Sequence, residues 1–372
     1  MYSNFHLFLS QTKPMRPKFH ALVVSDVRKE TADSVSIAFT VPEELKLNYQ
    51  FKAGQYLTLR AEVNGEDIRR SYSICSAEQD GELRVAIKKV ENGQFSTWAN
   101  ESVFVGMEMQ VMTPMGHFTP HVRGEKRHYV LYAAGSGITP MLSIAKSVLN
   151  ENVDAEVSLV YGNRHFNGII FRDEIEDLKD RNIGRLRVFH VLSGEPNDIA
   201  LFYGRIDSEK VEGFTKLFLP IESVNEVFVC GPESMITAVK DFYLTHGLAE
   251  ENVHFELFGT SNSTQVTREP KVVSADVSGM SDVTVIFDGN YTQFKMPKSG
   301  EMILDAAQRA GLDIPFSCKG GMCCTCRAHI REGAVDMKVN YALEPGEVEN
   351  GFVLTCQSVP VSDQVVVDFD KS

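Results

Sequence analysis

Five cysteines in the last quarter of the chain have the spacing of a metal centre. Cys318, Cys323 and Cys326 form the pattern C-x4-C-x2-C, Cys324 lies inside it, and Cys356 follows alone. Four thiolates in this spacing hold a [2Fe–2S] cluster, two on each iron. We therefore predict Cys318, Cys323, Cys326 and Cys356 as the ligands.

The residues between these cysteines suit the same chemistry. Gly320 and Gly321 allow a tight backbone wrap, so that loop N–H groups can point at the sulfurs. A zinc site is the weaker alternative, because structural zinc usually takes two short ligand pairs. We expect Cys324 to be a packed side chain rather than a ligand. The total of 7 cysteines is odd, and four of them lie within nine residues, which argues against a disulfide framework and for a reducing compartment, the cytoplasm.

A second motif, Arg69-Arg70-Ser71-Tyr72-Ser73-Ile74-Cys75-Ser76, places an aromatic residue between hydroxyl residues and after arginines. An arginine binds phosphate through two parallel hydrogen bonds, and an aromatic face covers a flat ring. The run Gly93-Gln94-Phe95-Ser96 follows, ahead of a helix-like stretch. A serine at a helix N-terminus, with unpaired N–H groups beside it, is an anion site. The alternative is that Ser96 is an ordinary N-cap.

A third motif, Gly135-Ser136-Gly137-Ile138-Thr139-Pro140, follows an apolar strand and opens a helix. Glycines there let a pyrophosphate approach the backbone, and proline suits a first helical turn. The triplet Cys230-Gly231-Pro232 ends another strand, at the carboxyl edge where parallel sheets bind ligands. Arg164 follows a third strand where no carboxylate is available for a ribose hydroxyl, which favours NADPH; a solvated Arg164 and NADH are the alternative.

The elements that must position these motifs can be predicted from two patterns in the sequence. Short strands with turn signals predict an antiparallel β-barrel or sandwich, of which we favour the barrel. Alternating strands and helices predict an α/β doubly wound parallel sheet. The predicted segments are an N-terminal extension at 1–17, the barrel at 18–125, the parallel sheet at 126–258, a Ser/Thr/Gly-rich linker at 259–281 and the cysteine-bearing segment at 282–372. Met15 is a candidate start, because the strand pattern begins just after it.

Composition excludes several classes of function. The 372 residues carry 37 Lys and Arg against 50 Asp and Glu, a net charge of -13, which leaves no basic excess for nucleic acid. The sequence shows no run of about 20 apolar residues for a membrane span. The N-terminus has no basic residue ahead of its apolar run, unlike a secretory signal.

Together the motifs resemble the ferredoxin–NADP reductase superfamily joined to a C-terminal plant-type ferredoxin, over about residues 18–371. The resemblance implies an α+β β-grasp fold for the last segment. It implies that Arg70 pairs with the phosphates of FAD, that Tyr72 packs on the flavin ring and that Ser73 bonds near its N5. It also implies that Gly93–Ser96 contacts the diphosphate. Cys230 would border the nicotinamide, and Glu256 and Phe258 would lie near the flavin, although ordinary strand residues are the alternative for both.

Three segments resemble most closely the reductases of ring-1,2-phenylacetyl-CoA epoxidases: Asn340–Pro345, Gly351–Ser358 and Val365–Asp370. This resemblance implies electron transfer from NADPH through FAD and the cluster to a di-iron oxygenase. Three alternatives stay open. One is a reductase for another acceptor, namely a ring-hydroxylating or steroid-hydroxylating oxygenase or a hybrid cluster protein. Another is a non-enzymatic redox sensor. The third is a zinc-stapled binding module, in which the cysteines hold zinc instead of a cluster.

Overall fold

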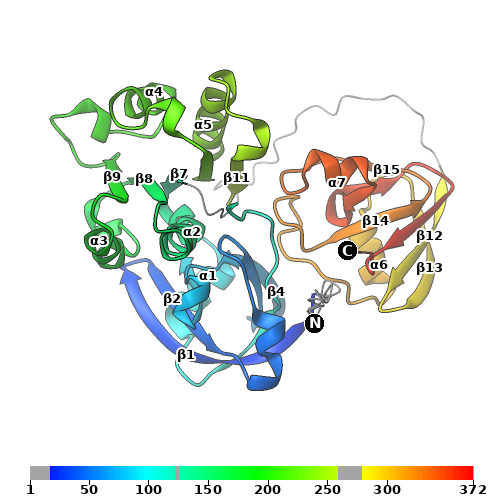
Figure 1. The fold of residues 1–372 in the computed structure, drawn as a ribbon. Coiled ribbons are helices and arrows are strands. Elements are labelled where there is room, and N and C mark those ends of the chain that lie inside the picture. The colour runs from blue at the N-terminus through cyan, green and yellow to red at the C-terminus, as the bar shows by residue number, and fades with distance from the viewer. Residues whose placement is uncertain (1–16, 122–125, 259–278, 372) are drawn as a thin grey trace, which may run out of the picture.

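The computed structural model describes residues 17–121, 126–258 and 279–371, and these ranges hold three main sheets in chain order (Figure 1). The predictions for residues 1–16, for the boundary at 125 and for the linker over 259–278 lie outside the described residues. No helix within the described ranges is long and apolar enough to cross a membrane.

The first sheet is antiparallel, in the order β4-β3-β6-β1-β2-β5. Its elements are β1 (Phe19–Thr31), β2 (Ser34–Thr40), β3 (Tyr56–Val63), β4 (Glu66–Ser73), β5 (Leu83–Lys88), α1 (Gln94–Ser102) and β6 (Glu108–Met112). A bridge between Ile74 and Val85 joins the two edge strands and draws the sheet into a barrel. Alternate apolar side chains point inward, and Leu57, Leu59 and Phe95 are among those buried there.

The hairpin of β3 and β4 carries most of the second motif. Asn64 and Gly65 have φ values of 55° and 81°, and two consecutive positive angles suit the tight turn that matches the twist of a hairpin. The register pairs Tyr56 with Ser73 and Thr58 with Ser71. Since side chains alternate along a strand, these four hydroxyl residues share one face of the hairpin.

The second sheet is parallel, in the order β11-β10-β7-β8-β9. Its elements are β7 (His128–Ala134), α2 (Ile138–Glu151), β8 (Glu156–Asn163), α3 (Arg172–Arg181), β9 (Leu186–Leu192), α4 (Ser208–Leu217), β10 (Glu226–Gly231), α5 (Glu233–Thr245) and β11 (Val253–Leu257). Helices α2 and α3 pack on one face, and α4 and α5 on the other. The strand order reverses beside β7, so the carboxyl ends of β7 and β10 form the edge where such sheets bind ligands.

The third sheet is mixed, in the order β13-β12-β18-β14-β16. Its elements are β12 (Met280–Phe287), β13 (Asn290–Pro297), α6 (Ile303–Arg309), β14 (Arg327–Glu332), β16 (Phe352–Leu354) and β18 (Gln364–Asp368), with β15 (Val335–Met337), β17 (Ser358–Pro360) and α7 (Pro345–Glu349) beside it. Helix α6 packs its apolar residues into this core. The cysteine loop connects α6 to β14, and Cys356 follows β16.

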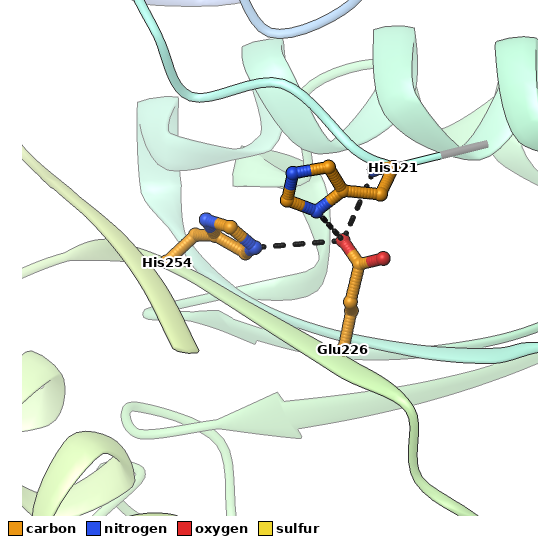
Figure 2. A group of neighbouring side chains, drawn as sticks. All are labelled: His121, Glu226 and His254. Atoms are coloured by element: carbon orange, nitrogen blue, oxygen red, sulfur yellow. Dashed lines mark hydrogen bonds and ion pairs between the residues drawn. The ribbon is translucent and has the colours of Figure 1, made fainter. Parts of the chain in front are cut away.

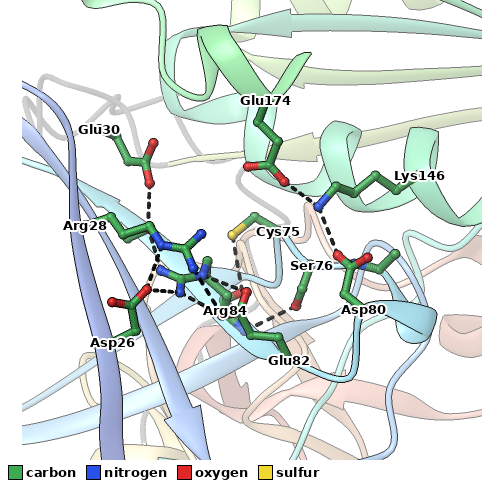
Figure 3. A network of polar contacts seen from close by, with 12 residues as sticks. Asp26, Arg28, Glu30, Cys75, Ser76, Asp80, Glu82, Arg84, Lys146 and Glu174 are labelled. Carbon is green, nitrogen blue, oxygen red and sulfur yellow. Dashed lines mark hydrogen bonds and ion pairs between the residues drawn. The ribbon is translucent and has the colours of Figure 1, made fainter. Parts of the chain in front are cut away.

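The barrel and the parallel sheet share a core and a charged seam. Buried Cys75 and Phe118 of the barrel belong to the same apolar cluster as α2. Lys146 on α2 lies 2.9 Å from Asp80 of the barrel and also pairs with Glu174 on α3 (Figure 3). Beside this seam, buried Arg84 pairs with two carboxylates of the barrel, so its charge is compensated. These contacts fix the two sheets against each other.

The predicted fold class is confirmed: an antiparallel barrel, a parallel sheet covered on both faces and a mixed sheet follow in that order. One difference is that β12 begins at Met280, inside the segment predicted as linker.

Candidate functional site

The four predicted cluster ligands gather in the third segment. The sulfurs of Cys318 and Cys323 are 3.2 Å apart, and Cys356 shares hydrogen bonds with Cys318 and Cys326. The hydrogen bond from Cys323 and a second one with Cys356 lower the pKa of the Cys318 thiol, and the N–H of Gly320 points at the same sulfur from 3.4 Å. A set of thiols held close together with backbone N–H groups directed at it fits a [2Fe–2S] cluster.

Cys324 lies apart from this set. Its thiol donates to the carbonyl of Ala342 at 3.2 Å, and the side chain belongs to the apolar core of the segment. Burial raises its pKa to about 12, which keeps it a neutral thiol. Gly321 has a φ of +75°, and a Cβ there would lie 2.9 Å from the carbonyl oxygen of Val339, so the tight wrap requires glycine.

The second and third motifs meet at one point. The Ser73 hydroxyl donates to Oε2 of Glu256 on β11 at 3.1 Å, and Glu256 pairs in register with Cys230 on β10. Burial raises the pKa of Glu256 to about 7, against the opposing effect of the Ser73 hydrogen bond. Burial, with a smaller contribution from Glu256, raises the pKa of the Cys230 thiol. The three predicted catalytic residues therefore converge from three strands.

The residues predicted to contact the flavin and its phosphates lie on β4 and at the start of α1. Arg70 is exposed, and its guanidinium donates to the neighbouring backbone carbonyl of Arg69 at 2.8 Å. Tyr72 packs against Phe95, with ring centroids 5.8 Å apart. Helix α1 begins at Gln94 with Gly93 as its N-cap, so the alternative of Ser96 as an N-cap is wrong.

The turn before α1 is closely packed around the Ser96 side chain. Its hydroxyl accepts from the N–H of Val90 and donates to the carbonyl of Gly93. A Cβ at Gly93 would lie 2.5 Å from the Ser96 oxygen, so a side chain there would displace this hydroxyl from its two hydrogen bonds. The arrangement fits a diphosphate held against the first turn of a helix.

The dinucleotide turn is packed directly on β10. A Cβ at Gly137 would lie 2.1 Å from the carbonyl oxygen of Cys230, and Gly135 has a φ of +54°. The Tyr161 hydroxyl donates to the carbonyl of Gly135 at 2.9 Å, and Thr139 donates to the carbonyl of Ser136. Both glycines are thus required by the geometry of the turn rather than by flexibility.

The remaining predicted residues lie around the same edge. Pro140 is buried in the first turn of α2, Gly231 ends β10 and Pro232 is the N-cap of α5. Arg164 follows β8 and is exposed, and Phe258 is half-buried against the core beneath α2. Which of these residues touch a cofactor stays a prediction.

Sequence reasoning missed the contacts between the barrel and the cysteine loop. Arg69 is 4% exposed, its Nη2 lies 2.6 Å from Oδ1 of Asp313, and its guanidinium stacks on the ring of Phe316. The hydroxyls of Tyr56 and Thr325 are 3.1 Å apart. No local pattern of the sequence signals these contacts, because Tyr56 and Thr325 are 269 residues apart.

A cluster outside the predicted site joins the barrel to the parallel sheet. Ring nitrogens of His121 and His254 lie 3.5 and 3.4 Å from Oε2 of the fully buried Glu226 (Figure 2). The Arg127 guanidinium lies 2.7 Å from the other oxygen, Oε1. Arg127 neutralises this carboxylate from within the same segment, and the N–H of His121, 3.2 Å from Oε2, connects the preceding segment to this buried ionic junction.

Family models match each of the three segments. An oxidoreductase FAD-binding domain matches residues 21–119, an oxidoreductase NAD-binding domain residues 131–241, and a 2Fe-2S iron-sulfur cluster binding domain residues 285–361. The order is the one predicted from the motifs.

The chain also matches known proteins over nearly their whole length. The chain is 41% identical to a subunit of the 1,2-phenylacetyl-CoA epoxidase of Escherichia coli K12, over 95% of this chain and 98% of that protein. It is 33% identical to the ferredoxin reductase component of 3-ketosteroid-9-alpha-monooxygenase of Mycolicibacterium smegmatis, over 96% and 99%. Among solved structures it is similar to phthalate dioxygenase reductase, with a TM-score of 0.58 and 27% identity over 94% and 98% of the two chains.

Proposed function

Because this chain belongs to the iron–sulfur flavoprotein reductases of the ferredoxin–NADP reductase superfamily, we propose that it is the NADPH-dependent reductase of a phenylacetyl-CoA epoxidase. The chain is an NAD(P)H-dependent oxidoreductase of the kind that serves oxygenases, with binding domains for FAD and a [2Fe–2S] cluster.

The observation that carries the proposal is the meeting of Ser73, Glu256 and Cys230 at the end of β10. The dinucleotide turn at Gly137 touches the same strand end, so a nicotinamide bound there would face the Ser73 hydroxyl. FAD, when bound, supplies hydride acceptance and release of single electrons. The protein's own part is to orient the nicotinamide and to hold a proton on the Ser73–Glu256 pair, whose carboxyl has a pKa of about 7.

Arg164 supports the preference for NADPH. It follows β8, next to the strand that carries the dinucleotide turn, and its guanidinium is exposed. An arginine at this position can bind a 2′-phosphate. Arg164→Ala is expected to lower kcat/KM for NADPH by roughly tenfold or more and to leave NADH almost unchanged, as loss of a charge-assisted hydrogen bond would do. An equal loss with both nucleotides would remove this assignment.

Identity of 41% over 95% of the chain supports a phenylacetyl-CoA epoxidase as the acceptor, since the ketosteroid monooxygenase reductase is 33% identical. The test is reconstitution with the purified epoxidase and phenylacetyl-CoA, and in parallel with a ketosteroid monooxygenase and its substrate. We expect coupled NADPH oxidation and product formation with the epoxidase alone. Equal or better coupling with the monooxygenase would contradict the proposed acceptor but leave the reductase activity standing. Rapid NADPH oxidation with an artificial acceptor would separately exclude the redox-sensor alternative.

A further inference from the structure

The outer face of the β3–β4 hairpin is unusually polar for a buried surface. Tyr56, Thr58 and Ser73 are each 5% exposed or less, and Thr58 and Ser71 share a hydrogen bond of 3.1 Å across the strands. Hydroxyl groups buried in this way need partners, because an unpaired one costs the full desolvation penalty. Apart from the Thr58–Ser71 bond, their partners lie outside the barrel.

Two of these hydroxyls contact the cysteine loop. Tyr56 Oη lies 3.1 Å from Thr325 Oγ1, and Ser71 Oγ donates to Ser317 Oγ at 2.9 Å. Thr325 directly precedes Cys326, and Ser317 directly precedes Cys318. The two hydroxyl pairs therefore hold the loop at both ends of the three-cysteine pattern.

The same face also contributes charge and the Ser73 contact. Arg60 and Arg69 pair in register midway along the hairpin. Their guanidinium groups lie 3.7 and 2.6 Å from the carboxylate of Asp313. Ser73, opposite Tyr56, donates to Glu256. One rigid hairpin thus contacts the loop at three points and carries Ser73 at its end.

We propose that the Tyr56–Thr325 and Ser71–Ser317 hydroxyl pairs are positioning contacts that fix the cysteine loop at a set distance from Ser73. The inference rests on the proposed function, in which one electron leaves a donor beside Ser73 and one reaches the cluster, with no bond formed or broken. The hydroxyls exchange neither electrons nor protons. They keep the cysteine loop at a fixed distance and orientation relative to the donor beside Ser73.

The test uses the holoprotein with Tyr56→Phe, Thr325→Val and the double variant. The matched control is Tyr49→Phe, because Tyr49 is another buried barrel tyrosine whose hydroxyl donates to a carbonyl within the barrel, at Val111. After mixing with NADPH, the flavin and cluster absorption bands are followed separately. We expect unchanged flavin reduction and cluster reduction slowed by roughly two- to tenfold in both single variants, the range that one hydrogen bond allows. The double variant should be no slower than the single variants, since both remove the same pair.

A second readout does not depend on electron transfer. Hydrogen–deuterium exchange in peptides covering 315–326 is expected to rise in Tyr56→Phe and Thr325→Val and to stay at the wild-type level in Tyr49→Phe. Wild-type exchange and wild-type cluster reduction in both variants would overturn the proposal, and so would additive effects in the double variant. If the wild-type protein fails to bleach with NADPH, the proposed function fails, whereas the exchange experiment still decides whether the contacts hold the loop.

Discussion

Replacing Gly137 by alanine tests the packing of the dinucleotide turn on β10. The added Cβ would lie 2.1 Å from the carbonyl oxygen and 2.7 Å from the carbonyl carbon of Cys230. Real Cβ atoms keep at least 3.0 Å from such atoms, so the turn must move away from β10 by about 1 Å. Both atoms belong to a strand in the middle of the sheet and cannot give way as a flexible side chain would.

A displacement of this size is costly for a group that orients a reacting nucleotide, and misplacement by 1 Å lowers rates by about 100-fold. We therefore expect Gly137→Ala to lower kcat/KM for NADPH by about 100-fold, measured with ferricyanide as acceptor. Overpacking is also expected to lower the stability by about 1–3 kcal/mol, measured as the thermal midpoint of the holoprotein. We expect flavin and cluster absorbance to remain, because neither the predicted diphosphate contact at Gly93–Ser96 nor the cysteine loop is among the atoms that this Cβ would meet.

Gly168→Ala is the matched control, since a Cβ at Gly168 meets no atom within 4 Å and its φ is not in the positive range. We expect it to retain wild-type kcat/KM. Wild-type kinetics in Gly137→Ala would refute the reasoning, because the turn would then tolerate a side chain that the geometry forbids. A comparable loss in both variants would point to general sensitivity of the segment and would refute it as well.

Three further predictions concern other parts of the molecule. Cys324→Ser should keep the cluster absorbance and iron content, because serine also donates to a carbonyl, whereas Cys323→Ser should lose both; cluster loss in Cys324→Ser would make it a ligand. Glu226→Gln should destabilise the protein by about 3–5 kcal/mol in thermal unfolding, because it leaves the buried Arg127 uncompensated, and an unchanged midpoint would contradict a buried ionic junction. Burial raises the pKa of Glu256 from 4.5 to about 7, so the folded protein binds this proton more tightly than the unfolded one, and stability relative to Glu256→Gln should fall as pH rises through that window. A stability difference that is constant between pH 4.5 and 7 would disprove the raised pKa.

Long strands and helices were predictable because their patterns are local. The apolar run of β7 and the glycine turn after it predict a strand and a helix start, and the structure has both. Strand β4 was not predicted as a strand, because its first residues, Glu66 and Asp67, are charged. It forms because the turn at Asn64 and Gly65 returns the chain alongside β3.

Short elements escaped prediction for a different reason. Strands β15, β16 and β17 have three residues each, too few for an alternation to stand out, and they are defined by their partners. Helix α4 has Gly213 in its interior, which weakens its helical pattern.

The features of the candidate site are likewise of two kinds, local sequence patterns and contacts between residues far apart in the sequence. The cysteine spacing and the glycine turn are local patterns, and both were visible. The pairing of Tyr56 with Thr325 joins residues 269 apart in sequence, and no local pattern states which loop a hydroxyl will meet. The meeting of Ser73 with Glu256 is equally non-local, and only the resemblance to known reductases suggested it.

The β3–β4 hairpin has a consequence for which sequence changes the chain can accept. Neighbouring residues of a strand face opposite sides of the hairpin, so Arg70 and Tyr72 lie on one face and Ser71 and Ser73 on the other. Inserting or deleting one residue within either strand would exchange the faces of every residue beyond it, turning Tyr72 outward and a serine into the barrel. An insertion therefore preserves both faces of the hairpin only if it adds two residues to a strand or falls in the turn. Over evolution, the length of this hairpin should vary far less than that of the loops elsewhere in the barrel.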